Sequence, residues 1–226
     1  MATRLVAAAT LGLAAQRADK AELRKRMRGV LGSLRPTTVA ADSARACERI
    51  RAHPALEASE SVSVYLTMPQ GECQTTMLVE QLFRSGKRVY VPRVDGKDPE
   101  QMSMVRMESL EQLMALERNS WGIPEPKRPD PDAPAASAEE RGELVDVVIV
   151  PALAFDSRCY RCGHGRGYYD SYLARVTTQR EAAQLPRATT IGLGLQEQLV
   201  PEVPVGDHDI QLDYVSLPDG LFSRVE

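Results

Sequence analysis

A run of β-branched residues followed by a glycine-rich segment constrains this chain more than any other feature. Val145-Asp-Val-Val-Ile-Val150 is nearly continuous in β-branched side chains, which is typical of a central strand covered on both faces. The chain then passes through Pro151–Asp156 and reaches Arg161-Cys-Gly-His-Gly-Arg-Gly-Tyr-Tyr-Asp170. This order predicts a buried strand, a glycine loop and a helix that begins at Tyr168, an arrangement found in layered α/β sheets.

The glycine loop has the composition of a phosphate-binding site. Glycine at positions 163, 165 and 167 allows positive φ angles and lets the backbone approach a ligand closely. Backbone N–H groups that end at a helix N-terminus attract anions, and Arg161 and Arg166 add charge that suits phosphate oxygens. The spacing differs from the dinucleotide and NTPase fingerprints. We interpret the loop as a phosphate site, and the alternative is a flexible structural turn.

The remaining periodicity predicts helices and strands in alternation. Helices are predicted over the following ranges: Arg17–Leu34, Val39–Ala52, Thr75–Ser85 and Tyr168–Val176. Strands are predicted over the following ranges: Ser61–Leu66, Arg88–Val91, Met102–Met107, Val145–Val150, Thr189–Leu195 and Ile210–Val215. The fold expected from this order is α/β, with a layered, mostly parallel open sheet flanked by helices.

Proline content and charge divide the chain into an extension and one domain. Residues 1–18 form an N-terminal extension, and residues 19–226 form a single α/β domain with a proline-rich loop over 122–142. The extension carries Arg4 and Arg17 and no acid before Asp19. It is either an alanine-rich continuation of the first helix or a weak mitochondrial presequence. We expect a cytoplasmic protein, with a mitochondrial location as the alternative.

The overall composition limits the classes of partner. The 28 basic and 31 acidic residues leave no basic surplus for nucleic acid as the main partner. No apolar run approaches the roughly 20 residues of a membrane span. Four cysteines in a chain of 226 residues do not make a disulfide scaffold and favour a reducing compartment. We expect a monomer whose partners are small molecules.

The glycine segment resembles the signature of the 5-formyltetrahydrofolate cyclo-ligase family, also called 5,10-methenyltetrahydrofolate synthetase. That signature is R-L-G-x-G-[KG]-G-[YF]-Y-D after a P-G-L-[AG]-F-D strand end. Shorter matches extend the resemblance from Lys20 to Val215, in this order: Lys20–Arg24, Leu66–Met68, Glu72–Thr75, Val91–Arg93, Met104–Arg106, Ser120–Pro126, Val203–Val205 and Asp209. The chain departs from the pattern at four positions, which are Cys159 for a usual glycine, Cys162 for leucine, Leu195 for phenylalanine, and the variable His164.

The resemblance implies an ATP- and Mg²⁺-dependent ligase that closes 5-formyltetrahydrofolate to 5,10-methenyltetrahydrofolate through a phosphorylated formyl group. It assigns ATP to the following residues: Lys20, Arg24, Arg161, Cys162, Gly163, His164, Gly165, Arg166, Gly167, Tyr168 and Tyr169. It assigns the folate to the following residues: Arg24, Leu66, Glu72, His164, Gly165, Arg166, Gly167 and Tyr168. Arg166 and Tyr168 are the implied catalytic residues, and Asp170 and Asp209 are the implied magnesium ligands.

Each of these residues also has a simpler interpretation. Lys20 and Arg24, with Arg28 one turn further, form a basic stripe that is commonly a solvated helix face. Glu72 is a solvated loop acid in the simpler view, and Asp170 is an acid favoured by the helix dipole. Trp121 either stacks on a flat ring or simply packs. For Asp209 we expect a position on the predicted strand 210–215, with its side chain on the polar face that Gln211 and Asp213 share.

Two other functions remain as alternatives. Cys159-Tyr-Arg-Cys162 followed by His164 is a C-x-x-C-x-H string, which suits a zinc or redox site only if distant residues complete the ligand set. The second alternative is a protein that binds folate or nucleotide without turnover. Metal analysis would identify the first, and an absorbance assay for methenyl-folate would identify the second.

Overall fold

The computed structural model describes residues 2–127, 137–138 and 141–225, with the backbone alone for residues 2–15. In this part of the chain, seven strands form one sheet in the order β3-β2-β1-β4-β7-β8-β9. The strands have these bounds: β1 Ser61–Val64, β2 Arg88–Val94, β3 Met102–Met107, β4 Val147–Val150, β7 Thr189–Leu193, β8 Tyr214–Leu217 and β9 Gly220–Ser223. The five inner strands pair in parallel, and the edge strands β3 and β9 pair antiparallel to their neighbours. This confirms the predicted fold class.

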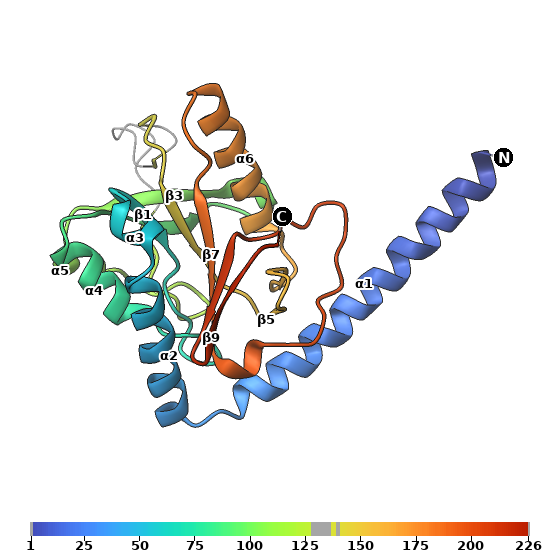
Figure 1. The fold of residues 1–226 in the computed structure, drawn as a ribbon, viewed down its shortest axis with the longest axis horizontal. Helices are drawn as coiled ribbons and strands as arrows, with labels where there is room; N and C mark the ends of the chain where they lie inside the picture. The colour runs from blue at the N-terminus through green and yellow to red at the C-terminus, as the bar shows by residue number, and fades with distance from the viewer. Residues whose placement is uncertain (1, 128–136, 139–140, 226) are drawn as a thin grey trace.

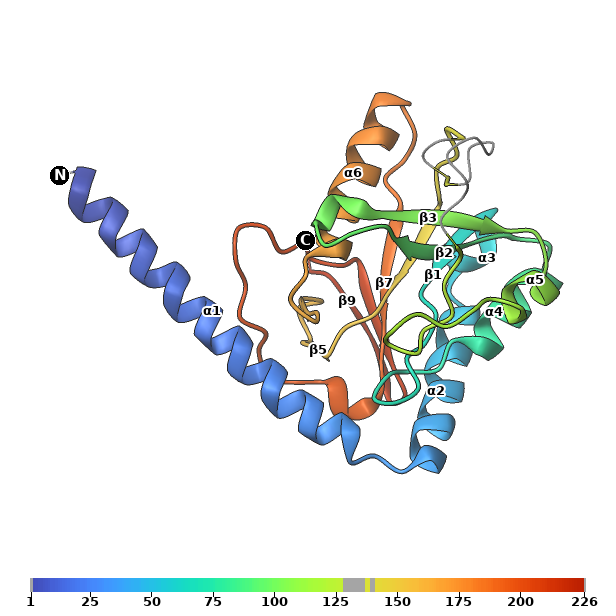
Figure 2. The same ribbon diagram turned by 180° about the vertical axis from the view of Figure 1, so that it is seen from behind.

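Helices cover both faces of the sheet (Figures 1 and 2). Their bounds are as follows: α1 Ala2–Gly32, α2 Pro36–Arg51, α3 Pro54–Ala58, α4 Thr76–Arg84, α5 Leu110–Met114 and α6 Tyr168–Ala182, with short 3₁₀ turns η1 Pro99–Gln101 and η2 Gln196–Gln198. Side chains of α2 and α4 join one core cluster, and side chains of α6 join the other. No helix among the described residues has both the length and the apolar character that a membrane crossing requires.

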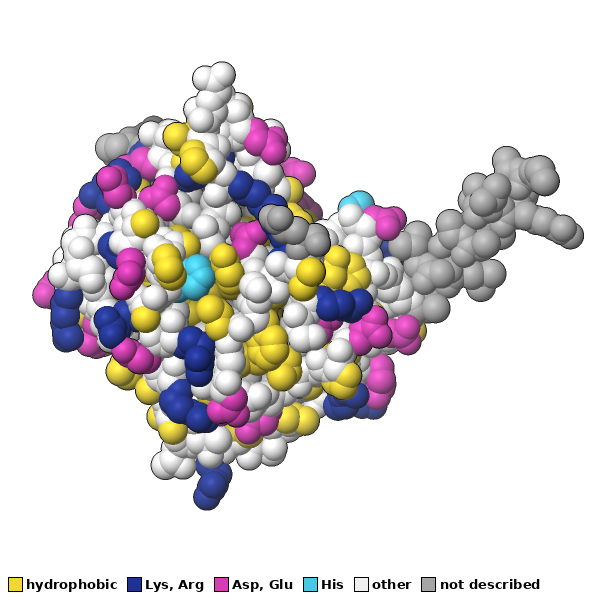
Figure 3. Space-filling view, viewed as in Figure 1, with side chains coloured by type: hydrophobic (Ala, Val, Ile, Leu, Met, Phe, Trp, Pro, Cys, Tyr) yellow, Lys and Arg dark blue, Asp and Glu magenta, His cyan; other side chains and the backbone are white. Residues whose placement is uncertain are grey.

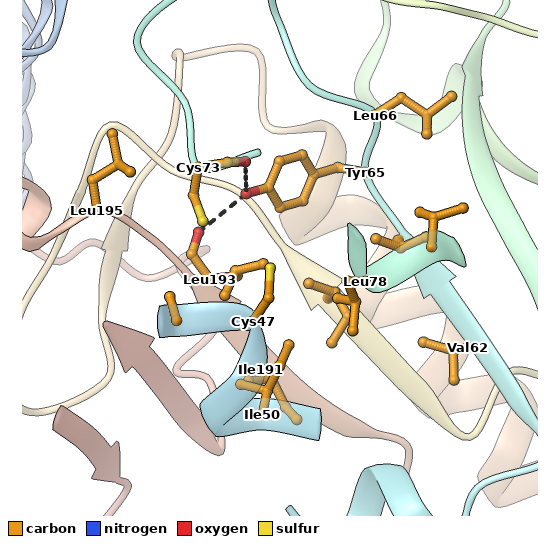
Figure 4. Close-up of a cluster of buried hydrophobic side chains, with 14 of the residues drawn as sticks. Cys47, Ile50, Val62, Tyr65, Leu66, Cys73, Leu78, Ile191, Leu193 and Leu195 are labelled. Atoms are coloured by element: carbon orange, nitrogen blue, oxygen red, sulfur yellow. Dashed lines mark hydrogen bonds between the residues drawn. The ribbon is translucent and has the colours of Figure 1, made fainter. Parts of the chain in front are cut away.

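The central strand β4 contributes side chains to both core clusters. All four of its residues are buried, as the continuous β-branched run predicts. Val147 and Ile149 lie in the cluster with α2 and α4, whereas Val148 and Val150 lie in the cluster with α6, because successive strand side chains point to opposite faces. Figure 4 shows the first cluster, in which Tyr65 donates to the carbonyl oxygens of Cys73 and Leu193.

The first helix lies across one end of the sheet and extends beyond it (Figures 1 and 2). It contacts η2, which follows the carboxyl end of β7, and the short strand β6 (Arg161–Cys162). Leu23, Met27 and Leu31 bury one stripe of this helix in the core. The helix begins at Ala2 rather than Arg17, so the alanine-rich extension continues it as a helix.

The predicted strand Ile210–Val215 is wrong in its first half, because β8 begins only at Tyr214. The N–H of Leu212 donates to Cys159, and the carboxylate of Asp213 accepts from the N–H and hydroxyl of Thr190, each at 2.8 Å. The N–H groups of Ile210 and Leu212 donate to Asp170 and Cys159 instead of β7, so the strand begins later than predicted. Asp209, Gln211 and Asp213 therefore do not share a strand face.

Several short elements were not predicted. They are α3, α5, the edge strand β9 and the hairpin of β5 (Ala154–Phe155) with β6. The predicted loop after Asn119 has bridges at Arg118–Pro124 and Val105–Ser137, while most of its proline-rich part, 128–136 and 139–140, lies outside the described residues. On the face in Figure 3, acidic and basic side chains are interspersed, in keeping with the near balance of charge.

Asp156 closes the hairpin that carries the chain from β4 toward the glycine loop. Its side chain is fully buried. One carboxylate oxygen accepts from the N–H groups of Arg158 and Tyr160, and the other accepts from Val203, each at 3.0 Å. A buried carboxylate with this many donors organises its surroundings, because removing it leaves several N–H groups without acceptors.

We expect Asp156→Ala to lower the free energy of unfolding by about 3 kcal/mol, since buried donors lose their acceptor. Arg158→Ala is the matched control. Its side chain is 49% exposed and forms an ion pair with the same carboxylate at 2.9 Å. Without it the carboxylate keeps its three backbone N–H donors, so its loss is expected to cost less than the loss of Asp156. Urea denaturation measures both, and equal costs would contradict this role for Asp156.

Candidate functional site

The glycine loop lies at the carboxyl end of the parallel strands, where open α/β sheets bind ligands. It runs from β6 into the first turn of α6. Gly165 and Gly167 have φ angles of +102° and +75°, which side chains disfavour and which account for glycine at these positions. Gly167 precedes α6, whose N-terminus has no side-chain cap. The first-turn N–H groups of α6 are therefore not satisfied by a capping side chain, and such groups can bind an anion.

Arg24 of α1 joins the loop directly. Its Nε donates to the carbonyl oxygen of Gly163 at 2.9 Å. A Cβ atom at Gly165 would lie 3.3 Å from the Cζ of Arg24, so this glycine also permits the close approach of the guanidinium. Arg24 is therefore partly buried against the loop, whereas Arg28 of the same stripe is exposed.

Arg161 and Arg166 lie in different environments within the loop. The Arg161 side chain is only 5% exposed, and its Nη2 lies 2.8 Å from a carboxylate oxygen of Asp170 in an ion pair without hydrogen-bond geometry. Its Cζ lies 5.8 Å from the centre of the Tyr169 ring. Arg166 is exposed, and within the described ranges it forms no hydrogen bond or ion pair. A free arginine beside a glycine loop suits the phosphate group that a nucleotide transfers.

The two predicted magnesium ligands come from separate segments that meet here. The N–H of Ile210 donates to a carboxylate oxygen of Asp170 at 3.3 Å, so Asp209 lies beside the first turn of α6. Asp209 forms an ion pair with Lys20 and accepts from the N–H of Gly206 at 2.5 Å. Each carboxylate thus already faces a cation. The described residues contain no cluster of three or more His, Cys, Asp or Glu side chains able to hold a metal.

Glu72 lies on the other side of the loop. It follows β1 in the chain and is buried, and one of its carboxylate oxygens accepts from the N–H of Met68 at 2.9 Å. Burial raises the pKa of Glu72 to about 7. The hydroxyl of Tyr169 is buried and has no hydrogen-bond partner in the described structure. Burial, and then the charge of Glu72, raise the pKa of Tyr169 well above its usual range. Glu72 is therefore not a solvated loop acid.

An imidazole of the glycine loop and an indole lie together. His164 and the half-exposed Trp121 make an edge contact with ring centres 6.0 Å apart. The Nε2 atom of His164 is buried without a partner among the described residues. Burial, followed by the charges of Arg28 and Arg24, lowers the pKa of His164, so the ring is neutral near pH 7. Leu66 is buried in the first core cluster (Figure 4).

Tyr168 has a structural contact that the sequence did not reveal. Its hydroxyl donates to the carbonyl oxygen of Gly96 at 2.8 Å, and its ring packs against the core beside α6. Tyr168 therefore ties the turn between β2 and β3 to the start of α6. The contacts of Tyr168 with Gly96 and of Glu72 with Met68 use backbone groups, so the pattern of side chains in the sequence does not predict them.

The C-x-x-C string lies in the turn of the β5–β6 hairpin. Cys159 and Cys162 are buried in different core clusters. Burial raises the pKa of Cys159 to about 11 and also raises that of Cys162, so both thiols are protonated near neutral pH. Cys159 has a φ angle of +65°, which explains why glycine is usual at this position in the pattern. This geometry gives no support to a zinc or redox site.

Comparisons with known proteins agree with this geometry. The model of the 5-formyltetrahydrofolate cyclo-ligase family matches residues 16–218. The mouse (Mus musculus) 5-formyltetrahydrofolate cyclo-ligase is 33% identical over 205 residues, covering 91% of this chain and 94% of that protein. The Escherichia coli K12 protein of the same name is 30% identical over 178 residues, covering 79% and 88%. The solved 5,10-methenyltetrahydrofolate synthetase of Aquifex aeolicus aligns with a TM-score of 0.67 at 25% identity, covering 92% and 93%.

The raised pKa of Glu72 predicts a pH-dependent stability. Between its usual pKa of 4.5 and about 7, folded Glu72 keeps a proton that the unfolded chain loses. The proton on Glu72 therefore stabilises the folded state fully below pH about 4.5, and this contribution is lost as the pH rises through about 7. We expect Glu72→Gln to match the wild type near pH 5 and to be about 2 kcal/mol more stable at pH 8. Thermal unfolding between these pH values measures the difference, with exposed Glu57→Gln as the control. A difference that is constant with pH would contradict the assignment.

Proposed function

Because this chain belongs to the 5-formyltetrahydrofolate cyclo-ligase family, we propose that it converts 5-formyltetrahydrofolate to 5,10-methenyltetrahydrofolate with ATP, releasing ADP and phosphate. The observation that carries the proposal is the junction of α1 with the glycine loop. There the Nε of Arg24 donates to Gly163 at 2.9 Å, and the loop leads into the N-terminus of α6 at Tyr168, which has no side-chain cap. The site thus combines a phosphate cradle with the buried acceptor Glu72.

In the proposed reaction the formyl oxygen attacks the γ-phosphorus of ATP, and ADP leaves. N10 of the folate then bonds to the activated carbon and loses its proton. The bond from that carbon to the phosphorylated oxygen breaks and releases phosphate. No protein nucleophile is needed, because phosphoryl transfer depends on alignment and charge neutralisation. The loop N–H groups, with Lys20, Arg24 and Arg161, would bind the nucleotide. The exposed Arg166 would meet the transferred phosphoryl group.

Glu72 would orient the folate. One of its oxygens is held by the N–H of Met68, which leaves the other to accept from the pterin amino or ring N–H groups. His164 and Trp121 would contact the ring system beside it, and Leu66 would supply an apolar wall. The hydroxyl of Tyr168 holds the turn at Gly96, so we propose that Tyr168 contributes by positioning that turn against the ligands.

Asp170 and Asp209 fit a magnesium ion that binds together with ATP. Each carboxylate forms an ion pair with a basic side chain in this structure. Two carboxylates with water and phosphate oxygens are an ordinary Mg²⁺ environment. When bound, the ion would neutralise charge on the transferring phosphates. The rest of the site's electrostatics comes from the four cationic side chains named above.

We also propose that the enzyme is a cytoplasmic monomer. All four cysteines are free and buried, as is common in a reducing compartment. Mitochondrial import through residues 1–18 is the alternative. Microscopy of the full chain fused to a fluorescent protein at its C-terminus, with and without residues 1–18, separates the two.

The reaction itself can be tested by absorbance. We expect methenyl-folate to form from 5-formyltetrahydrofolate only when ATP and Mg²⁺ are both present, with one ADP released per product. Product without nucleotide would contradict the mechanism. Binding of both ligands without product would identify a folate- and nucleotide-binding protein instead.

Loss of the loop arginine should affect the transition state more than binding. We expect Arg166→Ala to lower kcat by about 10², as for loss of a preorganised charge stabiliser. Steady-state kinetics give kcat and the KM for ATP separately. Arg84→Ala is the control, because that arginine is exposed on α4 and pairs only with Glu80 among the described residues. An unchanged kcat with a raised KM would make Arg166 a ground-state contact.

A further inference from the structure

We infer that the ion pair between Lys20 and Asp209 is exchanged when ATP and Mg²⁺ bind together, with Lys20 holding in the free protein the carboxylate that later faces the metal ion. The inference rests on the proposed function, which assigns Lys20 to the nucleotide and Asp209 to the ion. It adds a coupling between the two ligands that neither assignment contains.

The first observation is that carboxylates and cations of the site are paired with one another. Lys20 pairs with Asp209, and Arg161 pairs with Asp170 at 2.8 Å. Every group proposed to bind Mg²⁺ thus neutralises a group proposed to bind ATP. ATP and Mg²⁺ therefore compete with these ion pairs for the same charged groups.

The second observation is that the Lys20 pair is the one able to separate. The ammonium group of Lys20 lies at the end of a flexible side chain, and Asp209 is its only hydrogen-bond acceptor among the described residues. Arg161 is only 5% exposed and lies against the ring of Tyr169. Asp209 keeps a second contact with the N–H of Gly206 at 2.5 Å, so its carboxylate stays in place when Lys20 leaves.

The third observation is that Lys20 has a phosphate-binding group within reach. Four residues later on α1, Arg24 is bonded to the glycine loop, and residues four apart share one helix face. The ammonium group of Lys20 is a point charge on a four-carbon stem. It can therefore turn from Asp209 toward a phosphate bound at the loop while α1 remains fixed by Arg24.

These contacts predict that ATP and Mg²⁺ favour each other's binding. The Lys20 and Asp209 side chains are 15% and 21% exposed, so a charge left without a partner there is poorly compensated by water. ATP alone takes Lys20 and leaves Asp209 beside an anion. A divalent ion alone takes Asp209 and leaves the ammonium group beside a cation. Only the two ligands together satisfy both groups, and such coupling is reciprocal.

Two variants separate this exchange from a purely structural ion pair. ATP binding is measured by calorimetry without folate, once in EDTA and once with Mg²⁺. In Asp209→Asn, Lys20 has lost its competitor, so we expect ATP to bind about tenfold tighter than to the wild type in EDTA. The gain in ATP affinity on adding Mg²⁺ should shrink by a similar factor.

Lys20→Gln supplies the reciprocal test, with Mn²⁺ alone as the probe. Mn²⁺ suits the same oxygen ligands, and the free ion is counted by electron paramagnetic resonance. Without the resident ammonium group, we expect Mn²⁺ to bind about tenfold tighter than to the wild type in the absence of nucleotide. Lys127→Gln is the matched control. It removes the same charge from an exposed pair with Glu117 and should change neither affinity.

The possible outcomes are distinct. Tighter binding of each ligand in the variant that lacks its competitor supports the exchange. Unchanged or weaker ATP binding in Asp209→Asn and unchanged or weaker Mn²⁺ binding in Lys20→Gln would overturn it. Such a result would leave the proposed function standing if the wild type still binds ATP and forms product. A wild type that binds no ATP would overturn the proposed function as well.

Discussion

The hydrogen bond from Arg24 to the carbonyl oxygen of Gly163 joins residues 139 positions apart, and the site depends on it. It fixes α1 across the carboxyl end of the sheet, where the glycine loop alone would be an open turn. Through the same helix, Lys20 reaches Asp209, and Arg28 affects His164 electrostatically. The N-terminal helix is thus a wall of the site as well as part of the core.

The polar groups that lack partners indicate where ligands would bind. Buried polar atoms are almost always hydrogen-bonded, yet the described structure has ten buried side-chain atoms without such a bond. Four of them lie in the nine residues from Arg161 to Tyr169. They belong to Arg161, His164 and Tyr169. These buried atoms keep hydrogen-bonding capacity that phosphate or folate would satisfy in the proposed complex.

Local patterns were enough to predict the centre of the fold but not its periphery. The β-branched run and the start of α6 each depend on adjacent residues, and both were confirmed. The glycine loop as a phosphate site stays a prediction. The start of β8 was misjudged because the N–H groups of Ile210 and Leu212 donate to Asp170 and Cys159, two residues outside the seven-stranded sheet. The pKa of Glu72 and the pairing of Lys20 with Asp209 arise from burial and tertiary contact, so no sequence pattern contains them. The roles of the individual site residues stay predictions.

The site is proposed to activate the formyl oxygen by phosphoryl transfer, and an isotope label follows that oxygen directly. The substrate carries ¹⁸O in its formyl group, and turnover takes place in ordinary water with ATP and Mg²⁺. We predict that the released phosphate contains one ¹⁸O atom per product, visible by mass spectrometry. Unlabelled phosphate, with the label in water, would show that the formyl oxygen leaves without being phosphorylated and would contradict the account.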